Sequence, residues 1–158
     1  SLINSVLGGS MSSRLFQKIR EEKGMAYSIY SYPNTYTDCG MLSVYAATRP
    51  DCLKTVVDMA REEIQSLAEK GMAREEFEMA REQLKASYIL GLESTASRMN
   101  AAGRRLLLLN RTRTEDEVIA QINAITFEGV NALAKRILSA PGSVALVGKD
   151  AEKLMESI

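Results

Sequence analysis

The stretch Leu7–Tyr32, LGGSMSSRLFQKIREEKGMAYSIYSY, contains the signals that decide the fold. A glycine pair opens it, a short helix with basic and acidic residues follows, and Gly24 ends that helix before a tyrosine-rich strand. This order places Arg20 at the end of the helix and Tyr27 at the start of the strand. We therefore predict that the polar ends of these two side chains approach one point, and that the rest of the chain supports this corner.

The helix within this stretch has an apolar residue at every fourth position. Met11, Leu15 and Ile19 form its predicted buried side. The glycine pair at residues 8–9 ends an earlier helical segment, where glycine is free to adopt positive φ. That earlier segment, residues 1–7, has helical apolar spacing but no start signal. We expect the chain to be N-terminally truncated, with a closing strand before it.

Beyond the corner, the pattern predicts an antiparallel hairpin. Residues 26–32 are rich in Tyr, Ile and Ser, and residues 41–47 form a second apolar strand after the turn signal at residues 38–40. A short apolar run at residues 143–147 predicts a third strand, central in the sheet and buried on both faces.

Between the second and third strands the sequence predicts long helices. Gly71 separates two of them, and Ser94 starts a third whose inward face we expect from the spacing of its apolar residues. The apolar and small residues predicted for that face are Ala96, Met99, Gly103 and Leu106. The fold class is α+β: a small, mostly antiparallel sheet with long helices packed on one face, formed by residues 1–158 as a single domain.

Composition excludes several classes of function. The formal net charge is zero, which gives no reason to expect a nucleic-acid partner, and no apolar run is long enough to predict a membrane partner. There is no histidine, so the commonest general base and metal ligand is missing. Cys39 and Cys52 have no spacing typical of a disulfide framework or zinc set, so we expect reduced thiols and a cytoplasmic location.

Arg20 and Tyr27 are the candidate functional residues. Arginine offers a permanently charged fork that suits a carboxylate or carbonyl oxygen, and a phenol can donate a hydrogen bond to an oxyanion. The residues alone leave an alternative open, in which Arg20 pairs with Glu21 or Glu22 and Tyr27 packs as an ordinary strand aromatic.

The run Gly8–Tyr32 resembles the C-terminal half of the insulinase-type (pitrilysin-like, M16) zinc metallopeptidases, close to their bacterial processing-protease branch. The shared pattern is a glycine-rich turn, a serine, the tripeptide R-L-F, then Arg20, and a tyrosine seven residues later at Tyr27. The later segments TRPD at residues 48–51 and LESTASRM at residues 92–99 fit the same family.

The resemblance implies a LuxS/M16-like lobe and a two-lobed enzyme that encloses a peptide. It implies that residues 1–158 are the C-terminal substrate-binding lobe, and that zinc and the general-base Glu belong to the missing N-terminal lobe, with no metal bound by this chain. Carried over by position, Arg20 contacts the substrate and Tyr27 stabilises the tetrahedral oxyanion. The implied partners are a peptide substrate and the N-terminal catalytic lobe of the same protein; a homodimer stays open.

Two other functions stay open beside this one. The chain could be a non-catalytic peptide-binding or assembly lobe of an inactive family member, and the presence of both Arg20 and Tyr27 is the argument against that alternative. It could also be a stand-alone helical binding module, which rests only on the long amphipathic helices.

Overall fold

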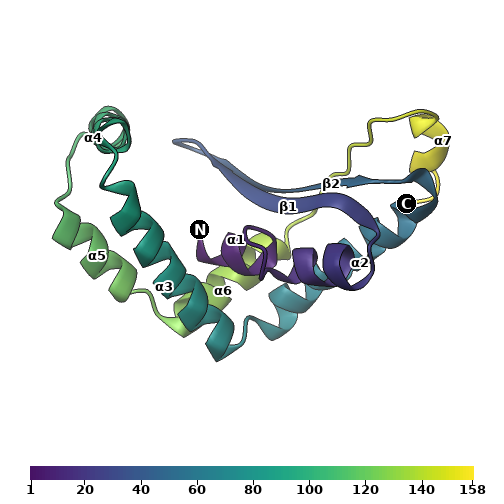
Figure 1. The fold of residues 1–158 in the computed structure, drawn as a ribbon, viewed down its shortest axis with the longest axis horizontal. Coiled ribbons are helices and arrows are strands. Elements are labelled where there is room, and N and C mark those ends of the chain that lie inside the picture. The colour runs from purple at the N-terminus through teal and green to yellow at the C-terminus, as the bar shows by residue number, and fades with distance from the viewer.

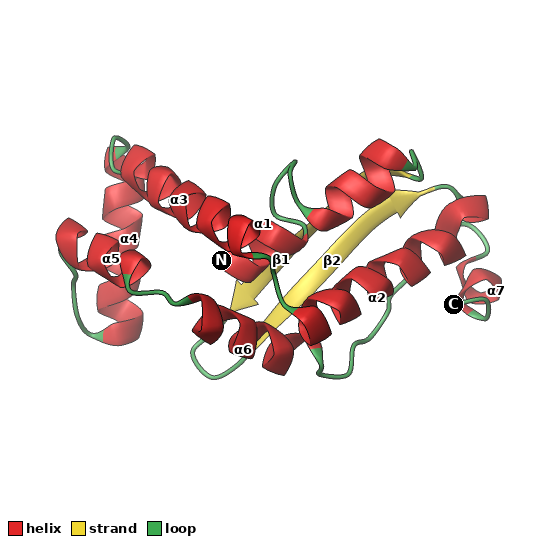
Figure 2. Cartoon of the chain, turned by 90° about the horizontal axis from the view of Figure 1, so that it is seen from below, coloured by secondary structure: helices red, strands yellow, loops and turns green.

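In the computed structural model, which describes residues 1–158, one small sheet lies over a layer of helices, and a helical arm extends away from it (Figure 1). The same layers are visible from below in Figure 2, where the strands lie behind the helices. No helix is both long enough and apolar enough to cross a membrane. The elements in chain order are α1 (Leu2–Leu7), the π-helix η1 (Phe16–Glu22), β1 (Ala26–Thr35), β2 (Gly40–Thr48), the short 3₁₀-helix η2 (Pro50–Cys52), α2 (Leu53–Lys70), α3 (Arg74–Gly91), α4 (Thr95–Leu109), α5 (Glu115–Asn123), α6 (Phe127–Leu138) and α7 (Ala151–Met155).

The sheet is a two-stranded antiparallel hairpin in which Tyr30 lies opposite Tyr45. The predicted α+β class is confirmed, but the predicted third strand is wrong. Residues 143–147 form no strand, and Val147 is 97% exposed. A strand needs a neighbour for its backbone N–H and C=O groups, and this segment is not hydrogen-bonded into the sheet. Apolar composition alone therefore did not identify a strand here.

The core lies between the inner face of the hairpin and the helices beneath it. Its largest fully buried side chains include Leu15, Ile19, Leu67 and Phe77, and α1 supplies Leu7. The predicted burial of Leu15 and Ile19 is confirmed. The prediction for residue 11 is wrong, because regular helix begins only at residue 14 and the side chain at 11 lies in the preceding turn, exposed.

Gly8 and Gly9 are required for close packing. Gly8 has a φ of −161°, which any residue can adopt, so the freedom of glycine to take positive φ is not used here. A Cβ at Gly8 would lie 2.7 Å from the backbone nitrogen of Ser31, which donates a hydrogen bond to the Gly8 carbonyl at 2.9 Å. A Cβ at Gly9 would lie 2.9 Å from the Asn4 carbonyl oxygen. The pair lets α1 approach the strand that carries the candidate site.

Local signals predict the helix boundaries well. Thr114 and Glu117 form a capping box at the start of α5, and Thr126 caps α6. Ser94 caps α4, and Gly71 ends α2 with a positive φ of 74°. These interactions involve residues only three or four apart, so the sequence contains both partners.

The predicted inward face of α4 is wrong. No residue of α4 is buried, and Met99 and Leu107 are exposed. Helix α4 lies in the arm with α5 and the distal end of α3, away from the sheet (Figure 1). Helical spacing predicts which residues share a face, but another element must cover that face before it is buried.

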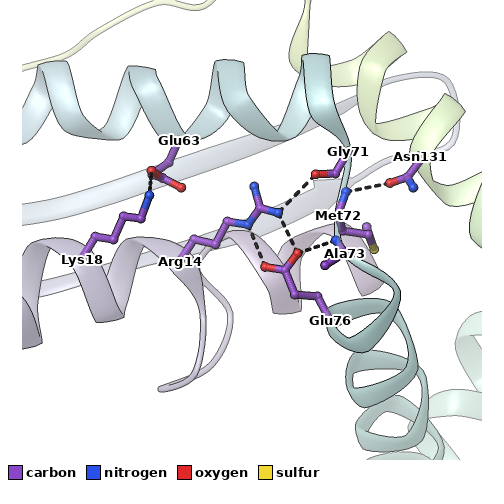
Figure 3. Close-up of polar contacts among 8 residues, drawn as sticks. All are labelled: Arg14, Lys18, Glu63, Gly71, Met72, Ala73, Glu76 and Asn131. Atoms are coloured by element: carbon purple, nitrogen blue, oxygen red, sulfur yellow. Dashed lines mark hydrogen bonds and ion pairs between the residues drawn. The ribbon is translucent and has the colours of Figure 1, made fainter.

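Two ion pairs join the segment containing η1 to helices α2 and α3 (Figure 3). Arg14 donates to both carboxylate oxygens of Glu76, from Nε at 2.8 Å and from Nη2 at 2.6 Å, and to the Gly71 carbonyl at 3.2 Å. Lys18 pairs with Glu63, whose side chain is buried on α2. A bidentate arginine pair fixes orientation as well as distance, so these contacts position the helix that carries Arg20.

The Arg14–Glu76 pair predicts a loss of stability in acid. Hydrogen bonding from Arg14 lowers the pKa of the Glu76 carboxyl below its ordinary value. A carboxyl with a depressed pKa stabilises the folded state at pH values above its unfolded-state pKa, which is about 4.3 for Glu. This stabilisation is lost as the pH falls through the lower folded-state pKa. We expect Glu76→Gln to lower the free energy of unfolding by about 1–2 kcal/mol at pH 7 and to have less effect near pH 3.

Urea unfolding at the two pH values measures this difference. Glu75→Gln is the matched control, because Glu75 is the exposed neighbour in the same helical turn. Equal losses for Glu76→Gln at pH 7 and pH 3 would contradict an ionic contribution.

Candidate functional site

Arg20 lies in the last turn of η1. A π-helix is rare and is frequently found at functional sites. The Arg20 side chain is 43% exposed, and its Cζ lies 4.9 Å from the centre of the Phe16 ring. Glu21 Oε1 is 4.0 Å from its Nε, at the outer limit for an ion pair between two exposed groups, where such pairs contribute little. Stacking on Phe16 orients the guanidinium while leaving its donors accessible.

A tight turn connects Arg20 to the strand. Gly24 has a φ of 61°, and its N–H donates to the Arg20 carbonyl at 3.1 Å. The next N–H, of Met25, donates to the Ile19 carbonyl at 3.0 Å, so the chain reverses direction at once. Tyr27 follows three residues after Gly24, and three residues span at most about 10–11 Å. Arg20 and Tyr27 therefore lie on either side of one tight turn. That their polar ends approach one point stays a prediction.

Tyr27 is the extra residue of a β-bulge. Ala26 pairs with Thr48 and Ser28 pairs with Ala47, so two steps along β1 correspond to one step along β2. Bulges often occur beside active sites, where they redirect a side chain.

The bulge determines which face of the sheet Tyr27 occupies. Ile29 and Ser31 point into the core, and regular alternation would place residue 27 on the same inner face. Instead Tyr27 is 88% exposed. The alternative in which it packs as an ordinary strand aromatic is therefore wrong, because its ring has almost no contact with the protein.

Three further tyrosines lie on the outer face of the hairpin. The ring centres of Tyr30 and Tyr45 are 5.0 Å apart, and those of Tyr30 and Tyr32 are 5.8 Å apart. Our sequence reasoning treated these residues only as strand formers. The Y-x-Y spacing of Tyr30 and Tyr32 places them on one face and was the signal that could have identified the group.

The residues of this chain do not fit a zinc site. Zinc in proteins is bound by Cys, His and acidic side chains. No group of three or more such side chains lies close enough together to hold a metal ion, and the sequence contains no histidine. We therefore assign no step at this site to a metal bound by this chain.

Comparison with known proteins gives consistent results. Residues 1–84 match the family model described as the peptidase M16 inactive domain. The chain is 44% identical over 146 residues to YmxG of Bacillus subtilis, named as an uncharacterized zinc protease, covering 92% of this chain and 36% of the relative. A protein of Streptomyces coelicolor, also named as an uncharacterized zinc protease, is 38% identical, covering 99% of this chain and 35% of that protein.

Solved structures share the fold. The peptidase M16 inactive domain from Pseudomonas fluorescens superposes with a TM-score of 0.77 at 22% identity, covering 87% of this chain and 33% of that one. A conserved protein from Enterococcus faecalis gives a TM-score of 0.72 at 27% identity, covering 85% and 31%. The chain thus spans about a third of the length of these relatives. The match over residues 1–84 and the shared fold show that this chain belongs to the M16 peptidase family.

Proposed function

We propose that this chain is the C-terminal, substrate-clamping lobe of a zinc-dependent endopeptidase and does not bind the zinc itself. The observation that carries the proposal is the β-bulge, which exposes Tyr27 at the corner formed with Arg20. The names of the relatives as zinc proteases support the same reading.

The chemistry of the two side chains fits cleavage of a peptide bond. The Arg20 guanidinium is charged at any physiological pH and can donate two parallel hydrogen bonds to a substrate carbonyl or carboxylate. The Tyr27 hydroxyl can donate to the oxygen that becomes negatively charged when the scissile carbonyl is attacked. Arg20 would therefore contribute mainly to binding the peptide, and Tyr27 mainly to the rate of the chemical step.

The remaining parts of the reaction belong to the other lobe in this proposal. The N-terminal lobe of the same protein would hold the zinc and the general base, and would enclose the peptide together with this lobe. Cys39 and Cys52 are both free thiols, a state typical of a reducing compartment, so we place the protein in the cytoplasm.

A second candidate function is a non-catalytic peptide-binding or assembly lobe. The description of the matching domain as inactive favours it. It predicts no role for Tyr27 in turnover, so kinetics of the full-length protein separate the two functions.

Arg20→Ala in the full-length protein tests the proposed function. We expect kcat/KM for a peptide substrate to fall roughly 10- to 100-fold, with most of the change in KM, because a hydrogen-bonded charge contact to the bound peptide is lost. Arg61→Ala, on the exposed side of α2, is the control and should retain the kinetics of the unmodified protein. Unchanged kcat/KM in Arg20→Ala would favour the assembly lobe.

The separated chain provides a second check. Residues 1–158 contain no histidine and no cluster of three or more Cys, Asp or Glu side chains that could hold zinc, so we expect no peptidase activity from them alone. Zinc-dependent cleavage by the purified chain would contradict the proposed division of roles between the lobes.

A further inference from the structure

We propose that the outer face of the β1–β2 hairpin binds large apolar side chains of an extended peptide, and that Tyr30, Tyr32 and Tyr45 select them. This inference rests on the proposed function and specifies its substrate class. The substrates are peptides with an aromatic or large aliphatic residue a few positions from the bond that is cut.

The outer face has no charged side chain. Helices α1, α2 and η1 lie on the opposite side of the sheet (Figure 1). A quarter of all residues in the chain are charged, so a two-stranded face without one is complementary to uncharged, apolar groups. Alternation and the strand register place on this face Tyr27, Ser28, Tyr30, Tyr32, Asn34, Met41, Ser43, Tyr45 and Ala47.

The three tyrosines form a preorganised group. Tyr30 contacts both of the others, with tilted rings at 31° to Tyr45 and 40° to Tyr32. Each of the three residues nevertheless remains between 41% and 45% exposed. Mutual packing restricts the rings before any ligand binds, which reduces the entropy lost on binding, and their free edges and faces can contact another aromatic or aliphatic group.

The size of the face fits a peptide better than a second copy of the chain. Ten residues of strand are about 33 Å long, and two strands about 4.8 Å apart give a face of roughly 300 Å². A stable protein interface buries about 800 Å² on each partner. One extended peptide segment could cover the outer face, whereas a dimer would need additional surface.

The position of the tyrosines relative to Tyr27 defines which substrate residue they contact. Tyr30 is three residues from Tyr27, about 10 Å along the strand. An extended peptide has the same rise per residue. The selected side chain would therefore lie about three positions from the carbonyl that Tyr27 contacts, and Tyr32 would extend the preference to about five positions.

The test uses the full-length protein and pairs of peptides that differ at one position, where one peptide has Phe and the other Ser. This position is varied from two to six residues on each side of the cleaved bond. Both cleavage and binding are measured, binding by fluorescence anisotropy of labelled peptides with zinc chelated. We expect the Phe peptide to be preferred roughly 10-fold at about the third position. The double variant Tyr30→Thr/Tyr45→Thr should lose this preference, because threonine keeps strand propensity but lacks the ring.

Two controls separate binding from structure. Tyr30→Phe keeps the ring and should retain the preference, and Tyr36→Thr, in the exposed hairpin loop, should also retain it. A preference that persists in the double variant overturns the inference. So does protection of Tyr30 and Tyr45 from a tyrosine-modifying reagent without peptide, which would mean that another part of the protein covers the face. A dimer that dissociates when Tyr30 is replaced by Thr would also overturn it.

Failure of the proposed function gives a different result. Absence of turnover together with Tyr30-dependent peptide binding would contradict the peptidase and support the peptide-binding face. Normal turnover that depends on Tyr27 but shows no Tyr30-dependent selection would support the peptidase and overturn the face.

Discussion

We expect Tyr27→Phe in the full-length protein to lower kcat about 100- to 1,000-fold, the range typical of removing a single oxyanion donor. The substitution removes one hydroxyl and keeps the ring, and Tyr27 is 88% exposed, so its loss has little effect on packing. Because the proposed hydrogen bond is stronger in the transition state than with bound substrate, KM should change far less than kcat. Steady-state kinetics with one peptide substrate measures both.

Tyr36→Phe is the matched control for this experiment. Tyr36 is also an exposed tyrosine but lies in the loop of the hairpin, outside the bulge, and its substitution should leave kcat unchanged. A fall in kcat of less than about threefold for Tyr27→Phe, or an equal fall for both variants, would exclude Tyr27 as an oxyanion donor.

Phe77→Ala should lower the free energy of unfolding of this lobe by about 3–5 kcal/mol, the usual cost of replacing a buried phenylalanine with alanine. Phe77 is 2% exposed, and its ring meets Phe127 edge to face with centres 5.7 Å apart. It joins α3 to α6, so its removal leaves a cavity between two helices. Native-state hydrogen exchange of the α3 amides in the full-length protein measures the change.

Met79→Ala is the control in the same helix. Met79 is exposed, two residues along α3, and its substitution should change the free energy by about 0.5 kcal/mol or less. Similar losses for Met79→Ala and Phe77→Ala would mean that helix propensity, not core packing, determines the stability of α3.

Signals that act over a few residues predicted the fold best. The bounds of the hairpin were predicted to within a few residues, and Gly71 and Ser94 mark helix ends as expected, because such residues act on their own neighbours. The third strand and the buried face of α4 were wrong for a shared reason. Each needs a covering element from elsewhere, and neither amino-acid composition nor spacing contains that information.

The candidate site was predictable in part. The sequence places Arg20 and Tyr27 on either side of one turn, and the resemblance drew attention to their spacing. The exposure of Tyr27 was not predictable, because it depends on how β1 pairs with β2 across the hairpin. The same limit applied to Tyr30 and Tyr45, which are neighbours in space but fifteen residues apart in the chain.

The bulge at Tyr27 also determines how this hairpin tolerates changes in length. Successive residues of a strand point to opposite faces of the sheet. The unpaired residue at the bulge therefore exchanges the two faces for all strand residues on its N-terminal side. Deleting Tyr27 would restore an uninterrupted ladder, with Ala26 directly before Ser28 and still opposite Thr48, without changing the faces of the residues that follow. In related chains, the number of residues after the arginine is therefore a poor guide to the equivalent tyrosine. The position of the bulge in the strand pairing must be compared as well.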